Sequence, residues 1–322
     1  GGRIPYPMNR PVTLMPRISP MFLSTLLVIL ISVSILCGLG IAHTLTDEQG
    51  QESARLQAIA DLQARQIADW LRERRGNAEI VRTSPDLPEE YEHWRNGGDA
   101  DATARMQTRL ARYLMPGSFG AIRFYGADGR LIWSTLEPPA QDTAPALAAG
   151  LREAGRMRQV QRVGPYLDAA QRSHLDYVVP LAAATGPPAI VVLHAEPTDW
   201  LYPTLQTWPS PTATGESFLF RRDGDQVLYL NPLRHRPDAP LSLRLPLASQ
   251  DLLAARLLRG SEREGAVMQG VDYRGVRVLG VARAIAGTDW FVVAKLDLDE
   301  IYAQCRGEIA LIVLAGLLTF LI

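Results

Sequence analysis

The sequence predicts an α+β protein in which a long N-terminal helix precedes two similar modules, each built on an antiparallel sheet, between two membrane-spanning helices. Three observations lead to this prediction. An uncharged apolar stretch lies near each end of the chain, and a helical pattern of apolar residues follows the first stretch. Strand and turn patterns then recur at an offset of about 95 residues. The length of 322 residues leaves room for two modules.

The first membrane segment is predicted over residues 21–43. Met21 to Ala42 carries no charge, and about 20 such residues cross the hydrocarbon core of a bilayer. The flanking charges set the orientation, because three arginines and no acid precede the stretch, whereas acidic residues follow it. We therefore expect residues 1–20 to be a cytoplasmic segment and everything after residue 43 to lie outside the cytoplasm.

A second membrane segment is predicted at the other end of the chain. Ile309 to Ile322 is apolar apart from one threonine, but fourteen residues are too few to cross a bilayer. We therefore expect residues 307–322 to be the start of a second span. Its remainder would return the chain to the cytoplasm, so a cytoplasmic part is expected to follow.

A stalk helix is predicted over residues 44–83. The segment 46–83 contains no proline, and its apolar residues recur at spacings of three and four until Ser84-Pro85 ends the pattern. These positions form one apolar seam: Leu56, Ala60, Ile67, Trp70, Leu71, Ala78 and Val81. An exposed seam of this kind favours a parallel homodimer.

Two modules are predicted from internal repeats. Residues 121–134 and 217–230 both show an apolar strand, an Asp-Gly turn and a second apolar strand, which is the pattern of a β-hairpin. Further segments also correspond: Leu175–Val178 with Val271–Arg274, and Ile190–Leu193 with Phe291–Ala294. We therefore expect a membrane-distal module over residues 84–205 and a membrane-proximal module over residues 206–304, each with a sheet of about five strands.

This organisation resembles the double Cache family of bacterial extracytoplasmic sensors. The resemblance rests on Leu62–Arg75 in the stalk, and on Gly215–Gly224 and Val271–Gly275 in the second module. It implies PAS-like (Cache) modules, a small-molecule ligand in the distal module, and an inner-membrane receptor. It also implies an effector beyond residue 322, such as a histidine kinase, a diguanylate cyclase or phosphodiesterase, or a chemotaxis signalling rod.

Five residues are candidates for ligand binding. Tyr166-Leu-Asp168 fits a Tyr-x-Asp motif of amino-acid-binding members of that family, and Glu196 lies about where their last acidic residue belongs. The Arg-x-Trp-Tyr cluster of those members is absent. Trp133 could form an aromatic wall and Arg156 could pair with a carboxylate, under a lid formed by residues 138–176. Core packing also explains Trp133, and a surface turn after Gly164-Pro165 explains Tyr166 and Asp168 equally well. Solvation at the surface explains Arg156 and Glu196.

Other kinds of site are not expected. In the proximal module, residues 272–274 and 234–236 could form a second polar site, although solvated loops explain them too. His174-Leu-Asp176 is taken as the one close pair of histidine and acid, and it lacks further ligands at helix or hairpin spacing, so no metal site is predicted. No cofactor or catalytic motif is expected in these residues.

The charge balance excludes one further class of partner. The chain has 33 basic and 34 acidic side chains and a net charge of -1, so no basic surface is predicted to hold nucleic acid. The sequence thus predicts the ligand-sensing region of a transmembrane receptor. Two alternatives remain open at this point: a membrane-anchored extracytoplasmic enzyme, and a structural or adhesion protein.

Overall fold

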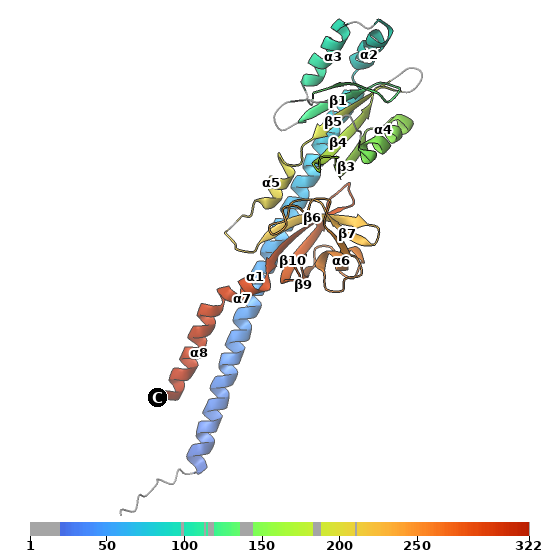
Figure 1. The fold of residues 1–322 in the computed structure, drawn as a ribbon. Helices are drawn as coiled ribbons and strands as arrows, with labels where there is room; N and C mark the ends of the chain where they lie inside the picture. Colours follow the sequence, from blue (N-terminus) through green and yellow to red (C-terminus); the bar gives the residue numbers. More distant parts are fainter. Residues whose placement is uncertain are drawn as a thin grey trace, which may run out of the picture. The chain divides into compact units, whose positions relative to one another are not determined.

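The chain is described by a computed structural model (Figure 1) that covers residues 20–97, 100–112, 114, 119–135, 144–182, 188–209 and 211–321. It divides into two compact units. One comprises the residues up to Gly50 together with those from Tyr302 onward, and the other comprises Gln51–Ile301.

The helix α1 (Pro20–Arg82) contains both the predicted membrane segment and the predicted stalk without a break. No proline follows Pro20 until Pro85, so nothing removes a backbone donor or clashes with the preceding turn. At its end the Thr83 amide still donates to the Glu79 carbonyl at 3.0 Å. Pro85 then stops the helix, because the residue before a proline is disfavoured in the helical conformation.

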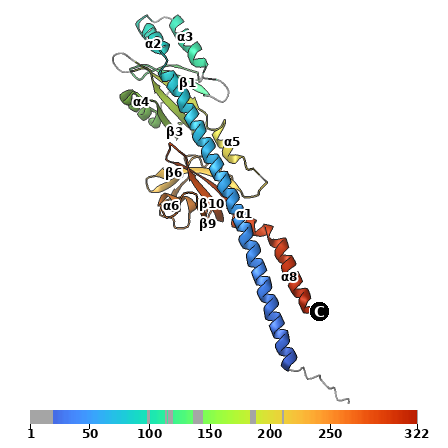
Figure 2. The ribbon, with the colours of Figure 1, turned by 180° about the vertical axis from the view of Figure 1, so that it is seen from behind.

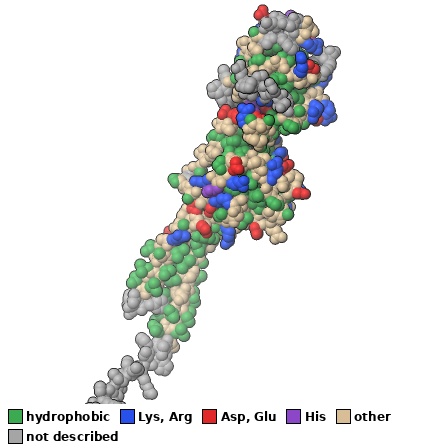
Figure 3. Space-filling view, in the orientation of Figure 1, with side chains coloured by type: hydrophobic (Ala, Val, Ile, Leu, Met, Phe, Trp, Pro, Cys, Tyr) green, Lys and Arg blue, Asp and Glu red, His purple; other side chains and the backbone are tan. Residues whose placement is uncertain are grey.

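The terminal unit carries the apolar helical segments. Large apolar side chains such as Leu27, Leu36 and Leu39 are exposed on the first part of α1, and Leu311 and Leu317 are exposed on α8 (Arg306–Leu321). Figure 3 shows that hydrophobic side chains predominate on the surface of the first part of α1 and of α8. The start of α1 is long and apolar enough to cross a membrane. A second segment reaches that length only if α7 (Leu298–Gln304) and α8, which meet at 48°, are taken together.

The first sheet has five antiparallel strands in the order β2-β1-β5-β4-β3. They are β1 (Ala121–Tyr125), β2 (Leu131–Ser134), β3 (Gln161–Leu167), β4 (Ser173–Pro180) and β5 (Ile190–Ala195). The predicted hairpin β1-β2 is confirmed. Gly129 in its turn has φ 79°, which glycine adopts without steric cost.

Helices cover both faces of the first sheet. On one face Tyr177 packs in the same apolar cluster as Ile67 of α1. On the other face Val178 packs with Leu147 and Ala154 of α4 (Pro145–Met157). The helices α2 (Asp86–Gly97) and α3 (Ala100–Ala111) pack against each other beside this module. The faces of the sheet therefore differ: one supports α1 and the other lies under α4.

The second sheet has six antiparallel strands in the order β8-β7-β6-β11-β10-β9, one more than expected. They are β6 (Glu216–Asp223), β7 (Gln226–Tyr229), β8 (Arg244–Pro246), β9 (Val267–Val271), β10 (Arg277–Ala284) and β11 (Trp290–Asp297). Short helices α5 (Leu201–Gln206) and α6 (Leu253–Leu258) lie before and within this module. The predicted hairpin β6-β7 is confirmed, with Gly224 at φ 60° in its turn.

The strand orders show which segments correspond. Strands β1, β2, β5, β4 and β3 occupy the places of β6, β7, β11, β10 and β9. The predicted match of Ile190–Leu193 with Phe291–Ala294 is confirmed, since these lie in β5 and β11. The match of Leu175–Val178 with Val271–Arg274 is wrong: the first lies within β4, whereas the second begins at the last residue of β9. The two segments have similar sequences but occupy different positions in their sheets.

Two further expectations need revision. The predicted lid over residues 138–176 includes α4, β3 and the start of β4, and its first residues lie outside the described part. The apolar seam of the stalk packs on the chain's own sheets, as Figure 2 shows for the course of α1 along them. Leu62 and Ile80 remain exposed on α1. Since the seam is covered within one chain, the homodimer stays a prediction without support from that seam.

Candidate functional site

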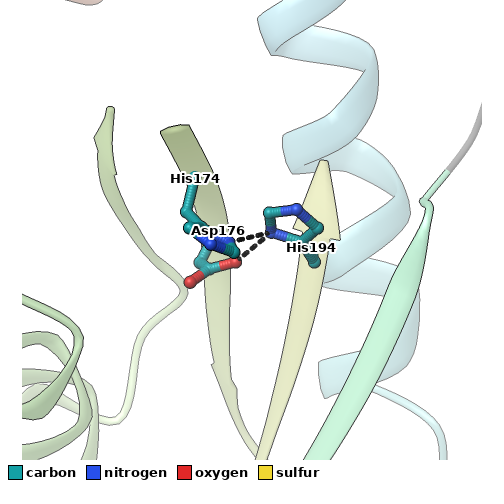
Figure 4. A group of neighbouring side chains, drawn as sticks. All are labelled: His174, Asp176 and His194. Carbon is teal, nitrogen blue, oxygen red and sulfur yellow. Dashed lines mark hydrogen bonds and ion pairs between the residues drawn. The ribbon is translucent and has the colours of Figure 1, made fainter. Parts of the chain in front are cut away.

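Three buried polar side chains meet on the α4 face of the first sheet (Figure 4): His174, Asp176 and His194. His174 and Asp176 are two residues apart on β4, so both side chains point to the same face. His194 lies directly opposite Asp176 on β5. The strand register therefore brings together residues that are up to twenty positions apart in sequence.

The geometry of this cluster is tight. The Nδ1 atom of His194 lies 2.8 Å from Oδ1 of Asp176 and 3.4 Å from Nδ1 of His174. The exposed fractions of His174, Asp176 and His194 are 5%, 0% and 3%. Buried polar groups of this kind are costly unless they are paired, and here they are paired with one another.

Each member of the cluster has one further polar partner. Nε2 of His174 lies 2.9 Å from a carboxylate oxygen of Asp168, and Nε2 of His194 lies 2.9 Å from one of Glu196. The Tyr166 hydroxyl donates to Oδ2 of Asp176. Tyr166 reaches this position because the pairing of β3 with β4 shifts between Val163 and Tyr166.

The electrostatic balance differs between the two histidines. Burial would lower the pKa of His194, but its hydrogen bonds to Asp176 and Glu196 outweigh burial and raise this pKa to about 9. At His174, in contrast, burial dominates and lowers the pKa despite the hydrogen bond to Asp168. At Asp176 burial opposes ionisation, yet the hydrogen bonds from His194 and Tyr166 keep the pKa below its usual value.

Arg123 adds a positive charge to the same face. It lies on β1 opposite Val192, two residues before His194 on the neighbouring strand, so both project to the α4 side. The residue is 8% exposed, and within the described part of the chain its Nε has no hydrogen-bond partner. The positive charge of Arg123 also helps to lower the pKa of Asp176. An anion reaching this face would find a buried guanidinium donor.

The five residues predicted from the sequence fall into two groups. Tyr166, Asp168 and Glu196 all contact the cluster. Trp133 pairs with Phe124 and packs on the α1 face of the sheet, away from the cluster. The side chain of Arg156 is 69% exposed on α4 and pairs with Glu153 at 2.7 Å. The structure therefore brings three of the five together and leaves two elsewhere.

The sequence patterns did not lead us to predict that His174, Asp176 and His194 form one site. The sequence does carry a signal, because two strands contain histidine and an acid two positions apart: His174-Leu-Asp176 and His194-Ala-Glu196. The second pair was overlooked, so the first seemed to lack further ligands. In a sheet those ligands come from the neighbouring strand, at a spacing that only the register defines.

The second sheet holds a different buried cluster. Lys295 on β11 is fully buried, and its Nζ lies 3.3 Å from Glu216, 3.1 Å from Asp272 and 3.2 Å from Asp297. Arg274 bridges Asp272 and Asp297, both at 2.6 Å. The first of the two segments suspected from the sequence, residues 272–274, therefore joins a polar cluster whose charges largely compensate one another.

The neighbourhood of this second cluster includes the other suspected segment. The backbone amide of Arg234 donates to Glu216 at 2.6 Å, and the Tyr273 hydroxyl donates to Glu216 at 3.1 Å. The amide of His235 in turn donates to the Tyr273 hydroxyl at 3.2 Å. Glu216 and Arg234 also line a pocket of about 470 Å³ together with Trp208.

Lys295 occupies in the second sheet the place that His194 occupies in the first. Lys295 pairs with Glu216, the first residue of β6, and His194 pairs with Ala121, the first residue of β1. In both sheets a basic side chain thus stands at the same register position among carboxylates. The second sheet has a lysine side chain at this position and the first sheet has an imidazole.

Stability in acid should depend on the second cluster. Burial opposes ionisation of Asp272, but its hydrogen bond from Arg274 and the charge of Lys295 keep the pKa below the ordinary value of 3.8. A carboxyl with a depressed pKa stabilises the fold above its unfolded pKa, and that stabilisation is lost as pH falls through the folded pKa. We therefore expect the free energy of unfolding to fall steeply below about pH 4.

Urea titrations at pH 5, 4 and 3 measure this dependence. The variant Asp272→Asn should show a shallower slope in this window, whatever its stability at pH 5. Equal slopes for the variant and the unaltered chain would contradict the assignment to Asp272. Asp128→Asn is the matched control, because Asp128 lies in an exposed turn with a side chain 63% exposed.

No family model and no curated protein matches the sequence. Solved structures do match the fold. The sensory domain of the Campylobacter jejuni chemoreceptor Tlp3 has a TM-score of 0.54 at 9% identity, over 81% of this chain and 99% of that one. The ligand-binding domain of the Pseudomonas aeruginosa amino acid chemoreceptor PctB, in complex with L-Arg, has a TM-score of 0.51 at 15% identity, over 79% and 98%.

A third similar structure is the ligand-binding domain of Mlp24 with asparagine, at a TM-score of 0.50 and 16% identity, over 82% of this chain and 96% of that one. Identities this low establish the fold alone. The chain therefore has the double Cache fold of the ligand-binding domains of bacterial chemoreceptors, as its sequence led us to expect.

Proposed function

We propose that this chain is the extracytoplasmic ligand-sensing region of a transmembrane receptor in the bacterial inner membrane. The ligand site lies on the α4 face of the first sheet, in the membrane-distal module. Binding there shifts a two-state equilibrium, and the shift passes through the second module and a second span to a cytoplasmic effector. A histidine kinase and a diguanylate cyclase or phosphodiesterase are the effectors that the sequence resemblance favours.

One observation carries this proposal: on a buried face of the first sheet, where the carboxylates are paired, one guanidinium nitrogen of Arg123 has no partner among the described residues. This Nε of Arg123 lies on the same face as the carboxylates that contact His174 and His194, which are those of Asp168, Asp176 and Glu196. A small polar molecule with an anionic group and a donor group matches such a face, because each end finds a complementary charge. The fold supports this proposal, since two of the similar structures are complexes with amino acids.

Thermal denaturation of the full chain in detergent, with EDTA present, tests the proposal against amino acids and small carboxylic acids. At least one compound should raise the melting temperature, because a ligand that binds only the folded state stabilises it. The variant Arg123→Ala should weaken binding of that compound by about 10- to 100-fold, the range for hydrogen bonds to charged groups.

Arg156→Ala is the matched control. It removes the same side chain from an exposed position on α4, so affinity for the compound should be unchanged. A folded chain that no compound stabilises would count against direct sensing of an organic molecule. Equal loss of affinity in Arg123→Ala and Arg156→Ala would place the ligand elsewhere.

A further inference from the structure

The arrangement of hydrogen bonds around the two histidines fixes where their lone pairs point. An ionised carboxylate can only accept hydrogen bonds, so the Nε2 atoms that face Asp168 and Glu196 must carry the protons. Each neutral imidazole then keeps its lone pair on Nδ1. Both Nδ1 atoms face each other and the Asp176 carboxylate.

Three acceptors that face one another in a buried site need a positive charge between them. A proton on Nδ1 of His194 meets this need in the metal-free chain. A metal ion meets it better, because it accepts all three lone pairs at once. Two nitrogens bound to one tetrahedral zinc at about 2.0–2.1 Å lie about 3.3 Å apart. The two Nδ1 atoms are 3.4 Å apart, and all the ligand atoms lie within 4.8 Å of one another.

The residues around the cluster are hydrogen-bonded to its side chains as outer-shell residues are to the ligands of a metal site. Metal-binding histidines donate their second N–H to a carboxylate or carbonyl, which fixes the ring and its tautomer. Asp168 accepts this hydrogen bond from His174, and Glu196 accepts it from His194. Tyr166 holds the second oxygen of Asp176, which leaves the first directed at His194. Every candidate ligand therefore has its own positioning residue.

The second sheet offers an internal comparison. At the register position of His194 it carries Lys295, whose ammonium lies among three carboxylates. In the second sheet, a basic side chain of the protein itself therefore occupies this register position among the carboxylates. In the first sheet the side chain at this position is the imidazole of His194, a group that can bind a metal ion.

We propose that His174 and His194, through Nδ1, and Asp176, through a carboxylate oxygen, bind a divalent transition metal ion in the first module. Two imidazoles and one carboxylate suit Zn²⁺, Ni²⁺, Co²⁺ or Cu²⁺, whereas Mg²⁺ and Ca²⁺ require oxygen ligands. This inference rests on the proposed function in that it names a ligand class for the same sensory face. Positions of the metal left open by the protein could bind an anionic group of a second ligand next to Arg123.

Isothermal titration of Zn²⁺ into the full chain, freed of metal with EDTA and then of EDTA, tests the inference. Co²⁺ absorption in the visible range reports on the geometry of the site. We expect one tightly bound ion per chain. The variant His194→Lys should abolish binding, and it should fold without metal because it reproduces the arrangement around Lys295. Glu196→Gln should weaken binding by about 10- to 100-fold, as removal of an outer-shell partner does.

His235→Ala is the control, since His235 is exposed and lies outside the cluster. Its zinc affinity should equal that of the unaltered chain. If zinc binds His194→Lys as tightly as the unaltered chain, the ion binds elsewhere and the inference is wrong. If zinc does not bind while an organic compound stabilises the chain with EDTA present, the inference fails and the proposed sensing function stands. Failure of both kinds of ligand overturns both.

Discussion

The variant Lys295→Met is expected to lose about 3–5 kcal/mol of stability, which is the cost of breaking a buried ion pair by removing one partner. Lys295 is fully buried and lies within 3.3 Å of three carboxylates. Without the charge of Lys295, Asp272 and Asp297 still pair with Arg274. Glu216 would then keep only hydrogen bonds, from Tyr273 and the amide of Arg234.

Differential scanning calorimetry of the detergent-solubilised chain measures this loss as a fall in melting temperature of about 5–10 °C. Arg236→Met is the matched control, because it removes a positive charge from an exposed pair with Asp238 at 3.7 Å. Exposed pairs contribute about 0–1 kcal/mol, so the control should melt within a few degrees of the unaltered chain. A Lys295→Met variant as stable as the control would contradict the electrostatic role of Lys295.

The variant Trp70→Ala is expected to destabilise the chain by a similar amount, about 3–5 kcal/mol, the range for large aromatic residues replaced in a core. Trp70 on α1 is 6% exposed, and its ring stacks on Trp200 with centroids 5.3 Å apart and planes 11° apart. The guanidinium of Arg74 lies 5.4 Å from the centroid of the same ring. Truncation removes the stacking and the cation–π contact and leaves a cavity beside α1.

Leu62→Ala is the control for Trp70→Ala, because Leu62 lies on the same helix and is 51% exposed. Thermal unfolding followed by circular dichroism should show a change within about 0.5 kcal/mol for the control. If Trp70→Ala also changed stability by less than 1 kcal/mol, the contact of α1 with Trp200 would not contribute to the stability of the fold.

Much of the fold could be predicted because its signals are local. The Asp-Gly turns at Gly129 and Gly224 define hairpins, and the proline-free stretch before Pro85 defines the helix. The extra strand β8 was missed because it has three residues and no alternating pattern. The false match of residues 175–178 with 271–274 shows that similarity between short sequence segments is a weak guide to the fold. The first segment lies in β4, whereas the second begins at the end of β9.

The site was harder to predict, because its centre depends on pairing between strands. Tyr166, Asp168 and Glu196 were found through a motif, yet they surround the residues that face one another. His194 meets Asp176 only through the register of β4 with β5. Trp133 lies with its partner Phe124 on the opposite face of the first sheet, and its role in ligand binding stays a prediction.

The burial of Lys295 has a consequence for chemical labelling. It is the single lysine in the sequence, so the folded chain presents no lysine amine to acylating reagents. Coupling or cross-linking through lysine should therefore fail under native conditions. Acylation of Lys295 requires the second sheet to open, so the rate of its modification, read by mass spectrometry, measures how often this sheet opens while the chain remains otherwise folded.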